Sequence, residues 1–402
     1  MGRAPVGQRP EVTAGSPAPR TFADVYGRPP DGTWRAPGRV NLIGEFTDYN
    51  EGFVLPTTLP FATRASVARR DDDLVRVASA QHPDGTSAAT DAVRVSALRP
   101  GTVAGWPAYA LGVFWSLHTA GYALGGADVF VDSEVPIGAG LSSSAALECS
   151  VGLAVRELFG LDLSLEQLAL AAQRAENEFV GVPCGIMDQM ASLLCVPGHA
   201  LLLDARSLEH RQVPFGLERS GLVLMVLDTR VRHALGDSAY GDRRSACERA
   251  AASLGVRALR DVRPEDLGAA LARLDDPVLA RRVRHVVTEG ARVFEVARLL
   301  EASRLEDVGP VLTDGHRSLR DDYEVSCAEL DTAVDAALRA GALGARMVGG
   351  GFGGSAIALV RSGAAGAVAE AVGAAFAAAG FGAPRIFVAA PAAAVAANGH
   401  PR

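Results

Sequence analysis

A glycine- and serine-rich turn between a strand and a helix, "VPIGAGLSSSAALE", constrains the fold of this chain more than any other segment. Gly138 and Gly140 let the backbone approach a ligand closely, and three serines open the helix that follows. The first N–H groups of a helix have no partner within it, so this end is a ready anion site. A serine hydroxyl there can donate to a phosphate or bind Mg²⁺. A plain glycine turn with a serine N-cap fits this segment about equally well.

A second segment, "GRVNLIGEFTDYNEG", begins like a buried strand and ends in hydrogen-bond acceptors and hydroxyls. Glu45 and Asp48 lie among these polar residues, and Phe46 is the apolar exception. A strand end of this composition suits a small polyhydroxylated ligand.

An isolated aspartate, Asp188, follows the helix-breaking residues Gly181 and Pro183 and sits in an apolar run, "GIMDQM". A carboxylate in such surroundings is costly unless it is paired or used chemically. The alternative is that Asp188 caps a short helix, which is the commoner role of such an aspartate.

The segment "MVGGGFGGSAIALV" places five glycines between two strand-like runs. It resembles a dinucleotide-binding fingerprint only superficially, because a strand follows where that fingerprint requires a helix. A hairpin whose bare backbone approaches another group closely fits the pattern better.

Hydrophobic periodicity predicts an α+β protein rather than a doubly wound parallel sheet. Strands are expected at residues 40–43, 129–131, 200–203, 222–227, 346–348, 356–360 and 386–389. Helices are expected at residues 106–120, 143–159, 164–180, 240–254, 278–302 and 326–340, with a small-residue helix in 363–382. Ser164 with Gln167 and Ser326 with Glu329 form capping-box patterns at two helix starts. The last third is typical of part of a split βαβ unit.

Composition narrows the function classes. A net charge of -7 argues against a nucleic-acid partner, and all 39 basic residues are arginine. The lack of lysine excludes a Walker A loop, the strand lysine of protein kinases and Schiff-base chemistry. Five scattered cysteines without a C-x-x-C pair predict reduced thiols and a cytoplasmic protein. No membrane span is expected, since the apolar stretch 363–382 carries Glu370 and is built from alanine and glycine.

Together these segments resemble the GHMP family of small-molecule kinases, and within it the galactokinases. "GRVNLIGEFTDYN" is similar to the galactokinase signature, "GAGLSSSAALE" to the phosphate loop and "GGGFGG" to the third motif. "PCGIMDQ", "VRHALGDSAY" and "DGHRSLRDDYEVSCAELD" also match. The resemblance implies a two-domain GHMP kinase fold with the active site between a ribosomal-protein-S5-like and a ferredoxin-like domain. We expect these domains at 21–215 and 216–392, after a disordered lead-in, 1–20, and before a tail, 393–402.

The resemblance also implies an activity: ATP-dependent phosphorylation of the anomeric hydroxyl of D-galactose, giving α-D-galactose 1-phosphate and ADP. ATP and Mg²⁺ would be the cofactors and galactose the small-molecule partner. We expect the protein to be a monomer, although the sequence itself does not determine the oligomeric state.

The site residues implied by the resemblance fall into four groups. Asp188 is expected to be the catalytic base, and Arg39 to stabilise its carboxylate and the transferring phosphoryl group. The sugar is expected at Glu45, Phe46, Asp48, Gly185 and Tyr240. The phosphates are expected at Gly138, Gly140, Leu141, Ser142, Ser143 and Ser144, and the Mg²⁺ ion at Ser144 and Glu176.

One departure leaves alternatives open, because the galactokinase signature has histidine, a contact of the sugar 6-hydroxyl, where this chain has Phe46. A related sugar kinase with altered C6 tolerance, acting on L-arabinose or a 6-modified galactose, is one alternative. A non-catalytic galactose sensor is another, although the intact serine–alanine stretch 142–146 favours catalysis. Trp106 could stack on adenine or belong to the core, and His233 is interpreted as a loop histidine.

Overall fold

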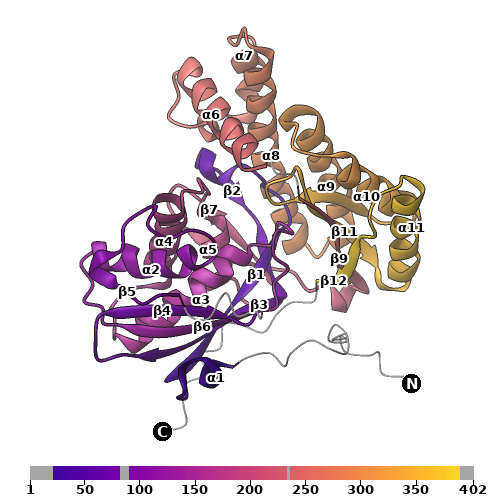
Figure 1. The fold of residues 1–402 in the computed structure, drawn as a ribbon. Coiled ribbons are helices and arrows are strands. Elements are labelled where there is room, and N and C mark those ends of the chain that lie inside the picture. Colours follow the sequence, from indigo (N-terminus) through magenta and orange to yellow (C-terminus); the bar gives the residue numbers. More distant parts are fainter. Residues whose placement is uncertain (1–20, 82–89, 233–235, 390–402) are drawn as a thin grey trace.

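The computed structural model describes residues 21–81, 90–232 and 236–389. Its N-terminal and C-terminal halves lie against each other, as the indigo-to-magenta and orange-to-yellow ribbons of Figure 1 show. Both halves combine helices with mainly antiparallel strands, which confirms the predicted α+β class. The lead-in 1–20, the tail 393–402 and His233 lie outside the described residues.

The N-terminal half is built on a five-stranded sheet of order β1-β3-β6-β4-β5, in which only the β4–β6 pair is parallel. Its strands are β1 Gly32–Asn41, β3 Pro56–Arg69, β4 Leu74–Ser79, β5 Val93–Arg94 and β6 Ala127–Ser133. Its helices are α1 Phe22–Tyr26, α2 Pro107–Thr119, α3 Ser143–Leu158, α4 Leu165–Arg174 and α5 Met187–Leu194. A smaller sheet adds β2 Phe53–Val54, β7 His199–Asp204 and β8 His210–Pro214.

The C-terminal half contains a four-stranded antiparallel sheet of order β10-β11-β9-β12. Its strands are β9 Leu222–Arg232, β10 Gly344–Val348, β11 Gly353–Arg361 and β12 Arg385–Val388. Its helices are α6 Gly236–Leu254, α7 Leu267–Leu271, α8 Pro277–Glu301, α9 Val308–Ser318, α10 Ala328–Arg339 and α11 Ala365–Ala378. The glycine segment forms the turn of the β10–β11 hairpin, as its sequence predicts, and the succession of elements is the split βαβ layout.

A hydrophobic cluster joins the two halves. Leu42 and Ile43, just after β1, pack in the same buried cluster as Val226 of β9 and Val293 of α8. The boundary predicted between residues 215 and 216 falls in the connection from β8 to β9, so it separates two sheets without separating two cores. It stays a prediction.

Two helix details differ from the sequence prediction. The capping box at Ser164 is confirmed, but the one at Ser326 is wrong. Helix α10 begins at Ala328 after Cys327, because the Ser326 hydroxyl bonds instead to Asp331 at 2.5 Å. The helix expected through residue 180 is α-helical only to the end of α4, and Ala175–Val180 continue it as a wider π turn.

Candidate active site

A cleft of about 710 Å³ lies between the two halves. Every site residue expected from the sequence lines it: Arg39, Glu45, Phe46, Asp48, Gly138, Gly140, Leu141, Ser142, Ser143, Ser144, Glu176, Gly185, Asp188 and Tyr240. The glycine hairpin, residues 349–354, lines it as well. The structure thus brings these residues around one cavity, while the role of each stays a prediction.

The Asp188 carboxylate is held at the first turn of α5 by two side chains. Arg39 donates from Nε to Oδ1 and from Nη2 to Oδ2, both at 2.8 Å. Ser142 donates its hydroxyl to Oδ2 at 2.5 Å. Asp188 is therefore paired in the manner that its apolar sequence context requires, and its carboxylate is oriented by a bidentate contact.

The phosphate-loop prediction places a tight turn before α3, and the structure contains it. Gly138 and Gly140 have positive φ values of 71° and 72°, and Ser142 is also left-handed at 59°. Because the Ser142 hydroxyl bonds to Asp188, it does not cap the helix. Ser143 and Ser144 begin α3 and face the cleft, at the end where a helix attracts anions.

The glycine hairpin packs backbone to backbone against this turn. A Cβ atom at Gly349 would lie 2.8 Å from the Gly140 carbonyl oxygen, closer than real contacts allow. The same carbonyl accepts from Nη1 of Arg39 at 2.7 Å. The hairpin and the turn thus form one wall of the cleft, with backbone rather than side chains at the contact.

Asp48 lies against Gly185, where a Cβ would stand 1.9 Å from the Asp48 carboxylate. Only glycine fits at that position while Asp48 keeps its place. Burial and the neighbouring Asp188 raise the pKa of Asp48 to about 6, although backbone N–H groups of Tyr49 and Met187 favour its charged form. Asp48 is thus a carboxylate that titrates close to neutral pH.

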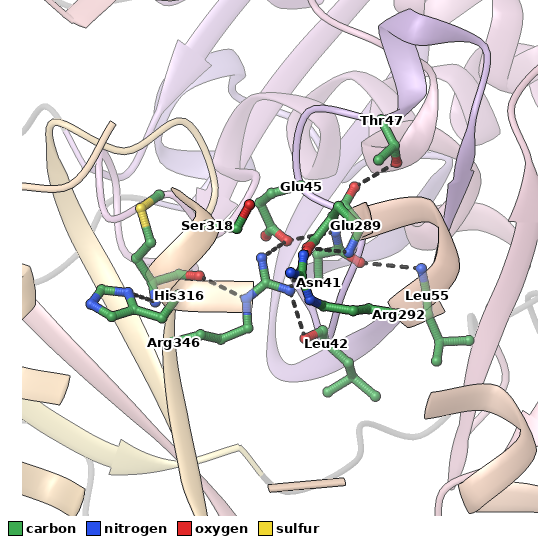
Figure 2. Close-up of polar contacts among 12 residues, drawn as sticks. Asn41, Leu42, Glu45, Thr47, Leu55, Glu289, Arg292, His316, Ser318 and Arg346 are labelled. Atoms are coloured by element: carbon green, nitrogen blue, oxygen red, sulfur yellow. Dashed lines mark hydrogen bonds and ion pairs between the residues drawn. The ribbon is translucent and has the colours of Figure 1, made fainter. Parts of the chain in front are cut away.

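Glu45 is almost completely buried, at 2% exposure, yet it reaches the cleft. Its Oε2 accepts from Asn41 at 2.9 Å and from Arg346 at 2.6 Å, and its Oε1 accepts from the Gly349 N–H at 3.1 Å. Burial raises its pKa to about 7, against the opposing charge of Arg346. Figure 2 shows the contacts of Glu45 with Asn41 and Arg346.

Phe46 forms part of an aromatic wall of the cleft. Its ring centroid lies 4.7 Å from Tyr323, 5.7 Å from Tyr240 and 6.2 Å from Tyr49. The ring is 4% exposed, and the residue has a positive φ of 65°. Phe46, the apolar residue within the polar segment after β1, therefore packs against aromatic side chains of the C-terminal half.

Glu176 and Ser144 lie close enough for a side-chain hydrogen bond, which lowers the pKa of Glu176. Burial and Asp188 outweigh it and raise that pKa to about 7. Gln189 Nε2 donates to Glu176 at 2.8 Å and to Glu148 at 3.1 Å. Glu148 is fully buried, its Oε1 has no hydrogen-bond partner among the described residues, and burial raises its pKa well above the usual range.

Sequence reasoning missed several residues behind the cleft wall. Arg346 was part of a predicted strand, Gln189 follows Asp188 directly, and Tyr323 lies in a matching motif, but none was assigned a role. The signal that could have found these three residues is that each is a polar side chain inside or next to a motif of the site. Trp106 directly precedes α2 and packs against the hydrophobic core of the N-terminal half. It is not among the described residues that line the cleft.

Three family models match the chain. The GHMP kinases N terminal domain matches residues 108–195, the GHMP kinases C terminal domain matches 296–378, and the galactokinase galactose-binding signature matches 20–69. A galactokinase of Streptomyces coelicolor is 55% identical over 384 residues, covering 95% of this chain and 98% of the relative. The chain belongs to the galactokinase family of GHMP kinases. Another relative, a galactokinase of Streptomyces lividans, is 52% identical and covers 94% of both chains.

Solved structures agree with this membership of the galactokinase family. The galactokinase of Lactococcus lactis complexed with galactose superposes with a TM-score of 0.88 at 32% identity, covering 94% of this chain and 97% of that one. Mevalonate kinase of Methanococcus jannaschii matches with a TM-score of 0.64 at 16% identity, over 90% and 98% of the two chains, which supports the fold alone. The predicted two-domain GHMP fold is confirmed. Within 21–81, 90–232 and 236–389, every helix is too short or too polar to cross a bilayer.

Proposed function

We propose that this protein is a galactokinase, which transfers the γ-phosphoryl group of ATP to the anomeric hydroxyl of D-galactose and releases α-D-galactose 1-phosphate and ADP. Membership of the family and the similarity to galactokinases support this activity. The observation that carries it is the bidentate contact between Arg39 and Asp188 beside the N-terminus of α3. This arrangement puts a carboxylate next to a site suited to phosphate.

Asp188 is the proposed base. Its Oδ2 already accepts from Arg39 and Ser142, whereas Oδ1 accepts only one of these donors, Nε of Arg39. A carboxylate has about four acceptor positions, so Oδ1 keeps room for the sugar hydroxyl. We propose that Oδ1 takes the anomeric proton as the sugar oxygen attacks the γ-phosphorus, while Arg39 keeps the carboxylate oriented.

The sugar is proposed to lie between the strand-end carboxylates and Tyr240. Asp48 and Glu45 offer acceptors into the cleft, and Gly185, which lacks a Cβ, lets the Asp48 carboxylate lie directly against it. A site that hydrogen-bonds a sugar hydroxyl discriminates against isomers in which that hydroxyl is misplaced, because its own acceptors are then unpaired. In the family the counterpart of Asp48 reads the axial 4-hydroxyl of galactose, and we propose the same role here.

Two residues of the cleft, one at the start of α3 and one in the π turn after α4, fit a Mg²⁺ ion. A serine hydroxyl and a carboxylate, Ser144 and Glu176, lie within hydrogen-bonding reach and leave the remaining positions of the ion for phosphate and water. Groups of three or more His, Cys, Asp or Glu that could enclose a metal do not occur among the described residues. Mg²⁺ would neutralise charge on the ATP phosphates, and Gln189 would hold the Glu176 carboxylate toward it.

The remaining proposals concern the state of the protein. The cysteines of the described residues are free thiols, which suits a reducing compartment, and we propose a cytoplasmic protein. We also propose a monomer, since each half contributes to the same cleft within one chain. Size-exclusion chromatography with light scattering checks this, and a mass of twice 41.7 kDa would contradict it.

An ADP-release assay with a panel of sugars tests the function. We expect ADP release with galactose and Mg²⁺-ATP, little with glucose, and a phosphate on C1 of the product by phosphorus NMR. Isothermal titration with galactose is run in parallel, because binding without ADP release would identify a sensor instead. ADP release with L-arabinose alone would indicate the related sugar kinase.

A further inference from the structure

Arg346 of β10 is a fully buried cation outside the predicted site. Its Nη2 donates to Glu45 at 2.6 Å, and its Nη1 lies 3.1 Å from Glu289 of α8. Both Arg346 and Glu289 are 0% exposed. Figure 2 shows the guanidinium between the two carboxylates, at the seam where the C-terminal half meets the strand end after β1.

The same cluster fixes the backbone of the loop that carries Glu45. Glu289 accepts from the Gly44 N–H at 2.9 Å, and Nη1 of Arg346 donates to the Leu42 carbonyl at 3.0 Å. His285 Nε2 lies 3.1 Å from the Glu45 carbonyl. The C-terminal half therefore holds both the backbone and the side chain of this loop.

The acceptor positions of Glu45 show what this hold achieves. Oε2 is occupied by Asn41 and Arg346, and among the described residues Oε1 accepts only from the Gly349 N–H. One acceptor position remains on Oε1, on a side chain that lines the cleft. Because Arg346 fixes Oε2, it decides where Oε1 points.

We propose that Arg346 is a positioning residue for sugar binding, which holds the Glu45 carboxylate so that Oε1 accepts a galactose hydroxyl. The inference rests on the proposed galactokinase function. It makes the affinity for galactose depend on a side chain of the C-terminal half that does not itself line the cleft.

The charges around Glu45 support a role beyond packing. Burial raises the pKa of Glu45 most, Arg346 lowers it, Glu289 raises it, and the Gly349 N–H and Arg39 lower it. His285 adds no charge near neutral pH, because burial lowers its pKa to about 4. Without the Arg346 cation, burial and Glu289 would therefore favour the protonated form of Glu45, and the charged acceptor would be lost.

Steady-state kinetics of Arg346→Met test the proposal. We expect KM for galactose to rise by about tenfold to a hundredfold, the scale of one charge-assisted hydrogen bond, with kcat within about threefold and KM for ATP unchanged. The acid limb of kcat/KM should move to higher pH. Arg346→Lys keeps the charge and should recover part of the affinity.

Arg282→Met is the matched control, because Arg282 is also buried at 3% exposure and pairs with Glu324 at 2.7 Å within the C-terminal half. We expect this variant to lose stability without changing KM for galactose or the pH profile. The same loss of galactose affinity in both variants would reduce Arg346 to a structural role and overturn the proposal.

A double-mutant cycle with Glu45→Gln gives the sharpest outcome. If Arg346 acts through Glu45, adding Arg346→Met to Glu45→Gln should change KM for galactose little further. Fully additive losses would overturn the proposal. If Arg346→Met does not fold, Arg346→Lys replaces it in the same double-mutant cycle, and KM for galactose is compared in the same way. A wild-type protein that does not phosphorylate galactose would refute the proposed function instead, so the two failures are distinguishable.

Discussion

Several carboxylates of the cleft are held where their charge is disfavoured. Burial raises the pKa of Asp48 to about 6 and the pKa values of Glu45 and Glu176 to about 7. Asp188 lies near Asp48 and Glu176 and adds to both shifts, whereas Arg39 is the cation that pairs with it directly. Such concentrated, opposed charges are typical of a site selected for chemistry at the expense of stability.

Replacement of the proposed base gives the first prediction. Asp188→Asn keeps the shape but removes the proton acceptor, so we expect kcat to fall by about a hundredfold or more. Galactose and ATP affinities should change little when measured by calorimetry. Turnover close to that of the wild type would show that Asp188 is not the base.

Asp48 links stability to pH. The pKa of Asp48 is about 6 in the folded protein, which lies above its value in the unfolded chain. The contribution of Asp48 to the free energy of unfolding is therefore complete below about pH 4 and is lost as the pH rises through 6. The side chain of Asp48→Asn does not ionise, so this variant does not lose stability in that way. Between pH 5 and pH 8 we expect its free energy of unfolding to rise by about 1 to 2 kcal/mol relative to that of the wild type. Calorimetric melting curves measure this, and parallel pH profiles for the two proteins would contradict it. Its galactose turnover should nevertheless fall.

Phe46 tests how the site treats C6 of the sugar. In the family the residue at this position is a histidine that contacts the 6-hydroxyl, and here an apolar ring packed on Tyr323 and Tyr240 takes its place. One added hydrogen bond is worth about 0.5 to 1.5 kcal/mol. We therefore expect Phe46→His to raise kcat/KM for galactose relative to 6-deoxygalactose by up to about tenfold. An unchanged ratio would show that Phe46 only packs beside the site.

At the scale of elements, two helix ends converge on the proposed metal site. The N-terminus of α3 presents Ser143 and Ser144, and the π turn Ala175–Val180 places Glu176 opposite them. A π turn shifts the register of the side chains that follow, and such turns are frequent at functional sites. Glu176 lies within this widened turn, which continues directly from α4, and it lines the cleft.

The metal prediction follows from this pair. Ser144→Ala combined with Glu176→Gln removes both proposed protein ligands, so we expect the Mg²⁺ concentration for half-maximal activity to rise by about tenfold or more. Galactose affinity measured by calorimetry should stay close to that of the wild type. If the Mg²⁺ dependence is unaltered, the ion binds elsewhere.

The two halves share a buried hydrophobic cluster within the described part of the chain. The cluster that contains Leu42, Ile43, Val226 and Val293 crosses the seam between the halves, and the Arg346 cluster crosses it beside them. Cores shared in this way couple the unfolding of the parts that share them.

Calorimetry checks this coupling. We expect one thermal transition with equal calorimetric and van't Hoff enthalpies, and Val293→Ala should shift this transition to lower temperature without splitting it. Two separate transitions, one for each half, would contradict the shared core.

The sequence by itself predicted most of the elements that carry the cleft, and its resemblance to the galactokinases implied which residues meet there. Glycines before a serine-rich helix start, an aspartate in an apolar run and a glycine hairpin are local signals, because each expresses a backbone or charge requirement of its own segment. The long strand β3 escaped prediction because several of its buried positions are threonines, Thr57, Thr58 and Thr63, so that burial along the strand does not appear as an apolar pattern.

Only the tertiary structure decided how the site is held. Ser326 pairs with Asp331 instead of capping α10, and Glu45 pairs with Arg346, which lies 301 residues further along the chain. Glu45 appeared in sequence as a free acceptor, yet most of its acceptor positions are occupied from within the protein. No local pattern encodes such a pairing, because it exists only once the packing of both halves has excluded water from the seam between them.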